Sequence, residues 1–227
     1  MTGDCRLVIT VDGPAASGKS TIARALAGHF GLPFLDTGLL YRAVAARLLA
    51  TGIDPTDETA LLRCAGELSE ADLATPDLAA EAIGALASRI AANPRLREAL
   101  RPFQERFAAR PEGAVLAGRD TGTVICPEAK AKLFVTATVE ERARRRCEQL
   151  RRRGERPIYA RVLEEMRERD RRDAERAVAP LRAAPDALVL DTTELDPART
   201  VAAAIAWVSE RRRACAGAEG TSPATQV

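Results

Sequence analysis

The sequence predicts an α/β fold in which helices flank a parallel β-sheet. Short apolar runs of strand-forming residues alternate with amphipathic helical segments, and this alternation is typical of βαβ units. Polar loops follow the first three apolar runs, at 12–21, 36–42 and 118–123. Because ligands bind at the carboxyl ends of parallel strands, we expect these loops to form the functional site.

Composition indicates a globular protein rather than a nucleic-acid coat. The chain has 227 residues, of which 46% are hydrophobic, enough for one domain with a buried core. Charged residues make up 29%, but the net charge is only +2. Five scattered cysteines and one histidine argue against a disulfide framework, a zinc site and a histidine-based triad. With no signal peptide or long apolar stretch, we expect a cytoplasmic protein without membrane contact.

Two strands and two helices are predicted in the first part of the chain. In order, they cover 7–11 (strand), 20–29 (helix), 33–35 (strand) and 39–50 (helix). Gly31 and Gly52 are expected to end the helices, because glycine readily adopts the left-handed conformation found there. Residues 53–110 carry Ala-rich helical patterns without a strand signal and are interpreted as a helical insert. We expect prolines to break this insert at positions 55, 76, 94 and 102.

The second part of the chain continues the alternation. Strands are predicted over 113–117, 131–135 and 187–190, and helices over 139–151, over 158–178 and from 197 onward. Thr138 and Glu141 have the spacing of a capping box, and Asp196 followed by Pro197 marks the start of the last helix. Residues 217–227 are predicted to form a disordered tail.

The loop after the first strand carries the strongest motif. Gly13 to Ser20 matches the pattern G-x4-G-K-[ST], with a predicted strand before it and a helix after it. Small residues allow backbone N–H groups to surround phosphate oxygens, and the helix N-terminus adds partial positive charge. Lys19 would reach the β and γ phosphates, and the Ser20 hydroxyl would bind Mg²⁺. A guanine-reading N-K-x-D motif is absent, and no strand ends in Asp-Asp or Asp-Glu, which favours a small kinase over a GTPase or a motor ATPase.

The other two loops offer a ring, two guanidinium groups and a carboxylate. Tyr41 and Arg42 would face a second small ligand, since arginine prefers bidentate phosphate or carboxylate partners. Arg119 is well placed for an anion, and Asp120 for Mg²⁺, directly or through water. The alternatives are a core tyrosine with a solvated arginine, and a local Arg–Asp pair in a turn.

Arginine-rich helices occupy the last third of the chain. Arg169, Asp173 and Arg176 share one helix face and would read a sugar hydroxyl and a phosphate, or else form a solvated salt-bridged face. The arginines between positions 142 and 156 could bind RNA, but no aromatic residues are interleaved with them for base stacking. A mobile lid that brings arginines over transferring phosphates explains them better.

Four segments in this order give a resemblance to a known family. "DGPAASGKST", "LDTGLLYR", "GRDTGTVICPEAKAKLFV" and "RDRRDAERAVAPL" resemble bacterial cytidylate kinases, over roughly residues 5–210. The resemblance implies the P-loop nucleoside-monophosphate kinase fold, with a five-stranded parallel sheet in the order 2-3-1-4-5 flanked by helices. It also implies one kinase domain at 1–216, with a core at 5–52 and 111–216, a monophosphate-binding insert at about 53–110 and a short lid at about 148–160.

The family's activity is transfer of the γ-phosphate of ATP to CMP or dCMP with Mg²⁺. The resemblance implies an ATP site made of Gly13, Pro14, Ala15, Ala16, Ser17, Gly18, Lys19, Ser20 and Thr21. For the acceptor nucleotide it implies Thr37, Tyr41, Arg42, Arg119, Arg169, Asp173 and Arg176. Ser20 and Asp120 remain the predicted metal residues. Lys19 and Arg119 are the predicted catalytic residues, together with a lid arginine that the sequence does not choose among Arg142, Arg145 and Arg146.

Two departures from the family pattern bear on the site. Ala117 stands where the family usually has an acidic residue before Gly-Arg-Asp, which shifts metal binding toward Asp120. Ala16 replaces a glycine, and we expect a backbone conformation that alanine tolerates. The rival functions are a kinase for UMP or a shikimate-like acceptor and a nucleotide-dependent RNA-binding module. We expect a monomer that binds no nucleic acid.

Overall fold

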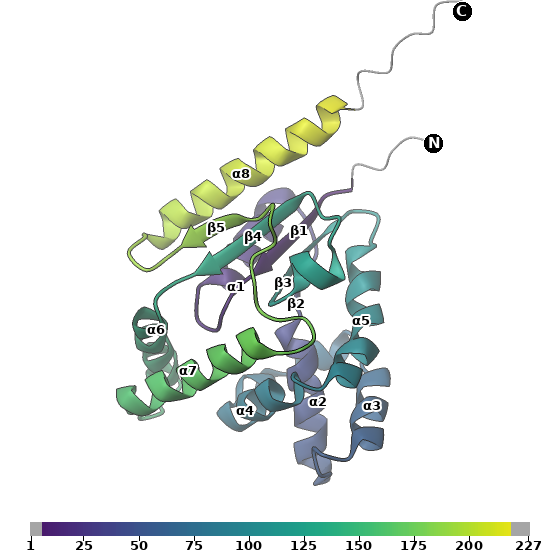
Figure 1. The fold of residues 1–227 in the computed structure, drawn as a ribbon, viewed down its shortest axis with the longest axis vertical. Coiled ribbons are helices and arrows are strands. Elements are labelled where there is room, and N and C mark those ends of the chain that lie inside the picture. The colour runs from purple at the N-terminus through teal and green to yellow at the C-terminus, as the bar shows by residue number, and fades with distance from the viewer. Residues whose placement is uncertain (1–5, 219–227) are drawn as a thin grey trace, which may run out of the picture.

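A parallel sheet forms the centre of the molecule, in a computed structural model that describes residues 6–218 (Figure 1). Its five strands lie in the order β2-β3-β1-β4-β5, and every neighbouring pair is parallel. They are β1 (Val8–Asp12), β2 (Phe34–Asp36), β3 (Ala114–Gly118), β4 (Ala131–Thr136) and β5 (Leu188–Asp191). The predicted fold class and strand order are confirmed, and each strand begins and ends within one residue of its predicted bounds.

Helices connect the strands and form the insert. They are α1 (Lys19–Phe30), α2 (Gly38–Thr51), α3 (Glu58–Gly66), α4 (Glu81–Ile90), α5 (Pro94–Ala108), α6 (Val139–Arg152), α7 (Tyr159–Glu175) and α8 (Pro197–Ala218). Shorter turns are η1 (Ala71–Ala74), η2 (Pro76–Ala79) and the single π-helical turn η3 (Thr121–Ile125). Gly31 and Gly52 follow α1 and α2 at a φ of 66°, as predicted. No helix in the described range is long and apolar enough to cross a membrane.

Each face of the sheet is covered by apolar side chains. On one face, Val11 and Leu133 pack against α1 and α8. On the other, Leu35 and Leu116 pack against the end of α5 and η3. The insert, 53–110, packs against α2 in a separate core that includes the fully buried Leu40, Leu48, Leu61, Leu96 and Leu100. Figure 1 shows the insert with α6 and α7 at the end of the molecule opposite to α8.

One predicted helix break is wrong. Pro102 lies inside α5, which runs unbroken from Pro94 to Ala108. Pro102 is exposed, as is Glu98, whose carbonyl loses its helical N–H partner and can bind water instead. Apolar residues on both sides of Pro102, Leu100 and Phe107 among them, bury their side chains. Their burial, worth about 1.5–3 kcal/mol each, offsets an interior proline that costs about 3 kcal/mol.

The helix ends differ from prediction at three places. The Thr138 hydroxyl accepts a hydrogen bond from the Glu141 N–H, but the Thr138 N–H donates to Thr193, so only half of the capping box forms. Helix α7 ends at Glu175 rather than at 178. Helix α8 begins at Pro197 as predicted and includes Gly217 and Ala218, the first residues of the predicted tail; residues 219–227 lie outside the described part of the chain.

Gly113 fits its place only because it lacks a side chain. Its φ is +91°, and an added Cβ would lie 2.3 Å from the backbone oxygen of Leu7. We expect Gly113→Ala to lower the free energy of unfolding by at least about 2 kcal/mol in urea titrations. The matched control is Gly28→Ala on the exposed side of α1, where no neighbour lies within 4 Å. This helical substitution should raise stability by about 0.5–1 kcal/mol, and equal effects at the two sites would contradict the expectation.

Candidate functional site

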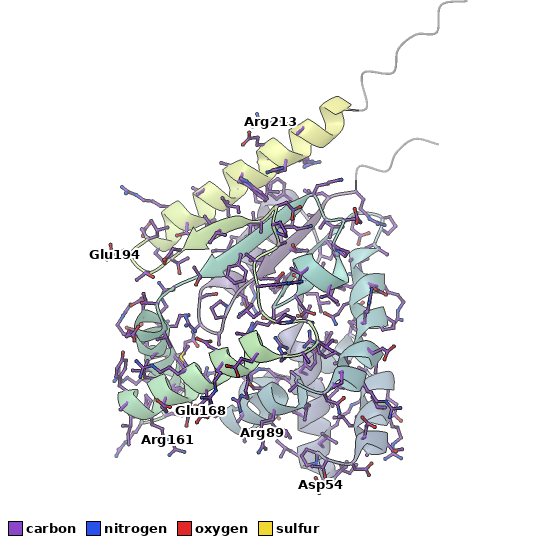
Figure 2. The ribbon with its side chains drawn as sticks, in the orientation of Figure 1. Asp54, Arg89, Arg161, Glu168, Glu194 and Arg213 are labelled. Carbon is purple, nitrogen blue, oxygen red and sulfur yellow. The ribbon has the colours of Figure 1, made fainter. Side chains whose placement is uncertain are left out.

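A cavity of about 840 Å³ opens at the carboxyl ends of the strands, a size that suits a small-molecule ligand. The three predicted loops all line it, together with parts of α4, α5, α6 and α7. Figure 2 labels Arg89 on α4 and Arg161 and Glu168 on α7, which belong to two of its walls. The predicted site residues that line the cavity are Ala15, Ala16, Gly18, Lys19, Ser20, Thr21, Thr37, Tyr41, Arg42, Arg119, Asp120, Arg146, Arg169, Asp173 and Arg176. Gly13, Pro14, Ser17, Arg142 and Arg145 are not among the lining residues.

The phosphate loop passes tightly against β4. Gly13 has a φ of +152°, and a Cβ there would lie 2.0 Å from the Val135 oxygen. Gly18 precedes α1 at a φ of +90°, and no side chain of the described residues caps this helix. The first N–H groups of α1 are therefore available to an anion.

The expectation for Ala16 is wrong. Its φ is +58°, in the left-handed region that disfavours residues with a Cβ. A single residue there costs about 1–2 kcal/mol, so the loop holds Ala16 in a strained conformation. Such strain persists only where surrounding contacts enforce it.

Lys19 is buried at the floor of the cavity. Its Nζ donates to the Pro14 carbonyl at 3.2 Å. Burial and the nearby Arg119 guanidinium together lower the pKa of Lys19 to about 7. A bound phosphate would oppose both effects, because a negative partner favours the charged form of the lysine. We therefore expect Lys19 to take up a proton when an anion binds beside it.

Arginines surround one buried aspartate in the cavity lining. Arg119 Nε donates to Asp173 Oδ2 at 2.8 Å, and Arg176 Nη2 lies 3.6 Å from Asp173 Oδ1. Burial alone would raise the pKa of Asp173, but the neighbouring arginines hold it below its ordinary value. Burial and Arg119 lower the pKa of Arg169 to about 10. Arg169 Nε and Arg176 Nη2 are buried without a hydrogen-bond partner among the described residues, so the cluster has donors left for an anion.

Side chains of the 36–42 loop are held by contacts with β3 and η2. The Thr37 hydroxyl donates to the Ala117 carbonyl at 3.0 Å, which ties the loop to β3. Arg42 Nη1 donates to the Leu78 carbonyl at 2.6 Å. Burial raises the pKa of Tyr41 to about 12, so its phenol stays neutral.

A polar corner of the cavity contains two residues that no sequence pattern indicated, Ser88 and Arg97. Arg97 on α5 donates to Asp120 Oδ2 at 2.6 Å in a buried ion pair, and its guanidinium lies 5.6 Å from the Tyr41 ring centroid. Ser88 on α4 has a buried hydroxyl without a partner in the described structure. Ser88 and Arg97 lie in the Ala-rich insert. Because arginine is common in this chain, the sequence gave no reason to single out Arg97 as a site residue.

Asp12 connects the phosphate loop to the 118–123 loop. Its carboxylate accepts from the Thr121 N–H at 2.9 Å, the Thr121 hydroxyl at 2.8 Å and the Gly122 N–H at 2.8 Å. Burial raises the pKa of Asp12 to about 6 despite these bonds. Asp12 thus fixes the positions of the two loops that carry Lys19 and Arg119 relative to each other.

The three predicted lid arginines have different places. Arg142 binds Asp170 through both guanidinium ends, at 3.1 and 2.6 Å, and reaches the Ala15 carbonyl. Arg145 binds Thr192, whose hydroxyl lies 3.0 Å from the Ser17 carbonyl. In this conformation both support the phosphate loop from behind, and of the three only Arg146 lines the cavity, paired with Glu81.

The family model and the similar proteins of known sequence all point to one family. A family model described as cytidylate kinase matches residues 9–210. The cytidylate kinase of Paramagnetospirillum magneticum is 52% identical over 208 residues, which are 90% of this chain and 99% of that protein. That of Xanthobacter autotrophicus is 55% identical over 206 residues, covering 91% and 99%. A solved structure of an uncharacterized protein from Eubacterium ventriosum, 14% identical, has a TM-score of 0.54 over 90% of this chain and 99% of that one, and supports the fold alone.

The depressed pKa of Lys19 can be tested by proton uptake. With a pKa of about 7, Lys19 is largely neutral at pH 8 and should become charged when phosphate binds. We expect ADP binding at pH 8 to take up about one proton, measured by calorimetry in Tris and in Hepes. Uptake should fall toward zero by pH 6, where Lys19 is already protonated, and should vanish in Lys19→Met. Binding without uptake at pH 8 in the unaltered protein would contradict this.

Proposed function

The chain belongs to the cytidylate kinase family, and we propose that it transfers the γ-phosphate of ATP to CMP or dCMP with Mg²⁺. The observation that carries the proposal is that one cavity is lined both by Lys19 and the α1 N-terminus and by the arginine cluster around Asp173. Phosphoryl transfer requires two phosphates to be aligned and their charge neutralised more than it requires a strong base.

ATP would occupy the phosphate loop, Gly13 to Thr21. Backbone N–H groups at the start of α1 would hold its phosphates, and Lys19 would bridge the β and γ oxygens. Ser20 lines the cavity, and its hydroxyl would be a fitting ligand for Mg²⁺, which prefers oxygen donors. When bound, Mg²⁺ would neutralise charge on the transferring phosphoryl group. Asp120, the other predicted metal residue, is paired with Arg97, which favours a part in acceptor binding instead.

The acceptor nucleotide would lie across the arginine cluster and the polar corner. Its phosphate would bind Arg42, Arg119, Arg169 and Arg176, because a guanidinium group can donate two parallel hydrogen bonds to two phosphate oxygens. Its base suits the corner formed by Ser88, Arg97 and Asp120. A cytosine offers an N4 amino donor, which a carboxylate can accept, whereas uracil presents a carbonyl oxygen there. Leaving a buried carboxylate opposite that oxygen would be costly.

The rival functions are not favoured. Four of the arginines that suggested RNA binding are paired within the protein, as Arg142–Asp170, Arg144–Glu141, Arg145–Glu141 and Arg146–Glu81. Few of their charges are left for nucleic-acid phosphates. Arg146 remains the lid arginine best placed to reach the transferring phosphate. A monomeric, cytoplasmic enzyme stays a prediction.

The proposal is tested by an ADP-release assay across nucleoside monophosphates. We expect CMP and dCMP to support turnover and AMP and UMP to support much less. Lys19→Ala should lower kcat at least about tenfold, because a charge-assisted contact to phosphate is worth roughly 1.5–3 kcal/mol. Equal rates with CMP and AMP would remove the cytidylate assignment, and a fully active Lys19→Ala variant would contradict the mechanism.

The orphan hydroxyl of Ser88 provides a second test. Ser88→Ala should raise the KM for CMP about three- to tenfold, the value of one hydrogen bond. Affinity for ATP should not change, because Ser88 lies on the acceptor side. Ser209→Ala on α8, outside the cavity lining, is the matched control. An unchanged KM for CMP would exclude Ser88 from the acceptor site.

A further inference from the structure

The carboxylate of Asp36 lies beside the phosphate loop, but Asp36 is not among the site residues predicted from the sequence. Asp36 ends β2, is half-buried and lines the cavity. Its Oδ2 accepts a hydrogen bond from Ser20 Oγ at 2.9 Å. Its Oδ1 accepts from the Gly38 N–H at 3.1 Å, which fixes the orientation of the carboxylate at the start of α2.

Strand geometry explains how Asp36 reaches Ser20. Side chains alternate along β2, so that Phe34 packs on the α1 face of the sheet and Leu35 on the opposite face. Asp36 therefore returns to the α1 face, at the first turn of that helix. Its register partner on β3 is Ala117, which brings no polar atom to this position. Asp36 is thus the carboxylate that contacts the metal-binding hydroxyl of the phosphate loop.

The direction of the hydrogen bond from Ser20 to Asp36 suits a cation site. A serine hydroxyl that donates its hydrogen to a carboxylate keeps its oxygen lone pairs available to a cation. No group of three or more histidine, cysteine, aspartate or glutamate side chains within residues 6–218 could hold a metal alone. Mg²⁺ in such a site is bound through nucleotide phosphates, one or two protein oxygens and several waters. A carboxylate at Asp36 would accept hydrogen bonds from those waters.

We propose that Asp36 is a positioning residue for the nucleotide-bound Mg²⁺, orienting the Ser20 hydroxyl and accepting hydrogen bonds from the metal's waters. This role presupposes the phosphoryl transfer proposed above. It predicts opposite effects of the Asp36 charge on two ligands. The negative charge favours Mg²⁺-bound nucleotide and disfavours metal-free nucleotide, because it repels phosphate oxygens.

The experiment compares ADP affinity with excess Mg²⁺ and with chelator, by calorimetry. Asn preserves the turn at Gly38, since Asn and Asp form the same side-chain turn, so Asp36→Asn removes mainly the charge. We expect Asp36→Asn to weaken binding of Mg²⁺–ADP about tenfold or more and to leave metal-free ADP binding unchanged or tighter. Asp36→Glu, which keeps the charge, should retain part of the Mg²⁺ effect.

Asp54→Asn is the matched control for removal of one negative charge. Asp54 lies at the far end of the insert (Figure 2), outside the cavity lining, and both affinities should stay unchanged. Equal weakening of both ligands in Asp36→Asn would indicate a merely structural role and overturn the inference, as would an unchanged Mg²⁺ effect.

Two outcomes keep this test separate from the proposed function. If the unaltered protein binds ADP neither with nor without Mg²⁺, it is the proposed function that fails. If Asp36→Asn lacks folded structure by circular dichroism, Ser20→Ala removes the hydroxyl that Asp36 orients and gives the same comparison. An unchanged Mg²⁺ effect in Ser20→Ala would also overturn the inference.

Discussion

Excess positive charge around one buried carboxylate is the constraint on which this structure depends. Arg119 and Arg176 pair with Asp173, and Arg169 lies close enough to stabilise its charge. One carboxylate cannot neutralise three guanidinium groups, and burial lowers the pKa of Arg169 and of the facing Lys19. Holding like charges together with little water is costly. A bound anion would reduce this cost, so the charges that line the cavity favour a phosphorylated ligand.

Holding these cations in place requires support from behind the cavity. Asp12 joins the phosphate loop to the 118–123 loop through three hydrogen bonds. Thr192 contacts the Ser17 carbonyl and is itself held by Arg145, while Arg142 links α6 to α7 and to the loop. Arg142 and Arg145 thus support the phosphate loop and do not line the cavity. Preorganised donors of this kind need no rearrangement during reaction.

Contacts across the cavity connect the insert to the arginine-rich helices. Arg146 pairs with Glu81 at the start of α4, and Arg153 donates to the Ala79 carbonyl at 2.6 Å. These contacts are polar and partly exposed, and such pairs contribute about 0–1 kcal/mol each. Such contacts cost little to break, unlike the buried links behind the phosphate loop. In enzymes that transfer phosphoryl groups, closure across a cavity excludes water from the reacting group.

The sequence by itself determined what depends on local chain chemistry. The strands, the phosphate loop and the ends of α1 and α2 follow from apolar runs, small residues and glycine, which act within a few residues of one another. The resemblance supplied the strand order, which the structure confirms, and the residues proposed to bind the acceptor. Only the tertiary structure brought Ser88, Arg97 and Asp36 to the cavity, gave Arg142 and Arg145 supporting contacts in place of cavity positions, and kept α5 intact across Pro102. The physical reason is that these outcomes depend on burial and on partners distant in the chain. Arg97 and Asp120 are 23 residues apart, and Ser20 and Asp36 are 16 apart, so neither pair leaves a mark in a local sequence pattern.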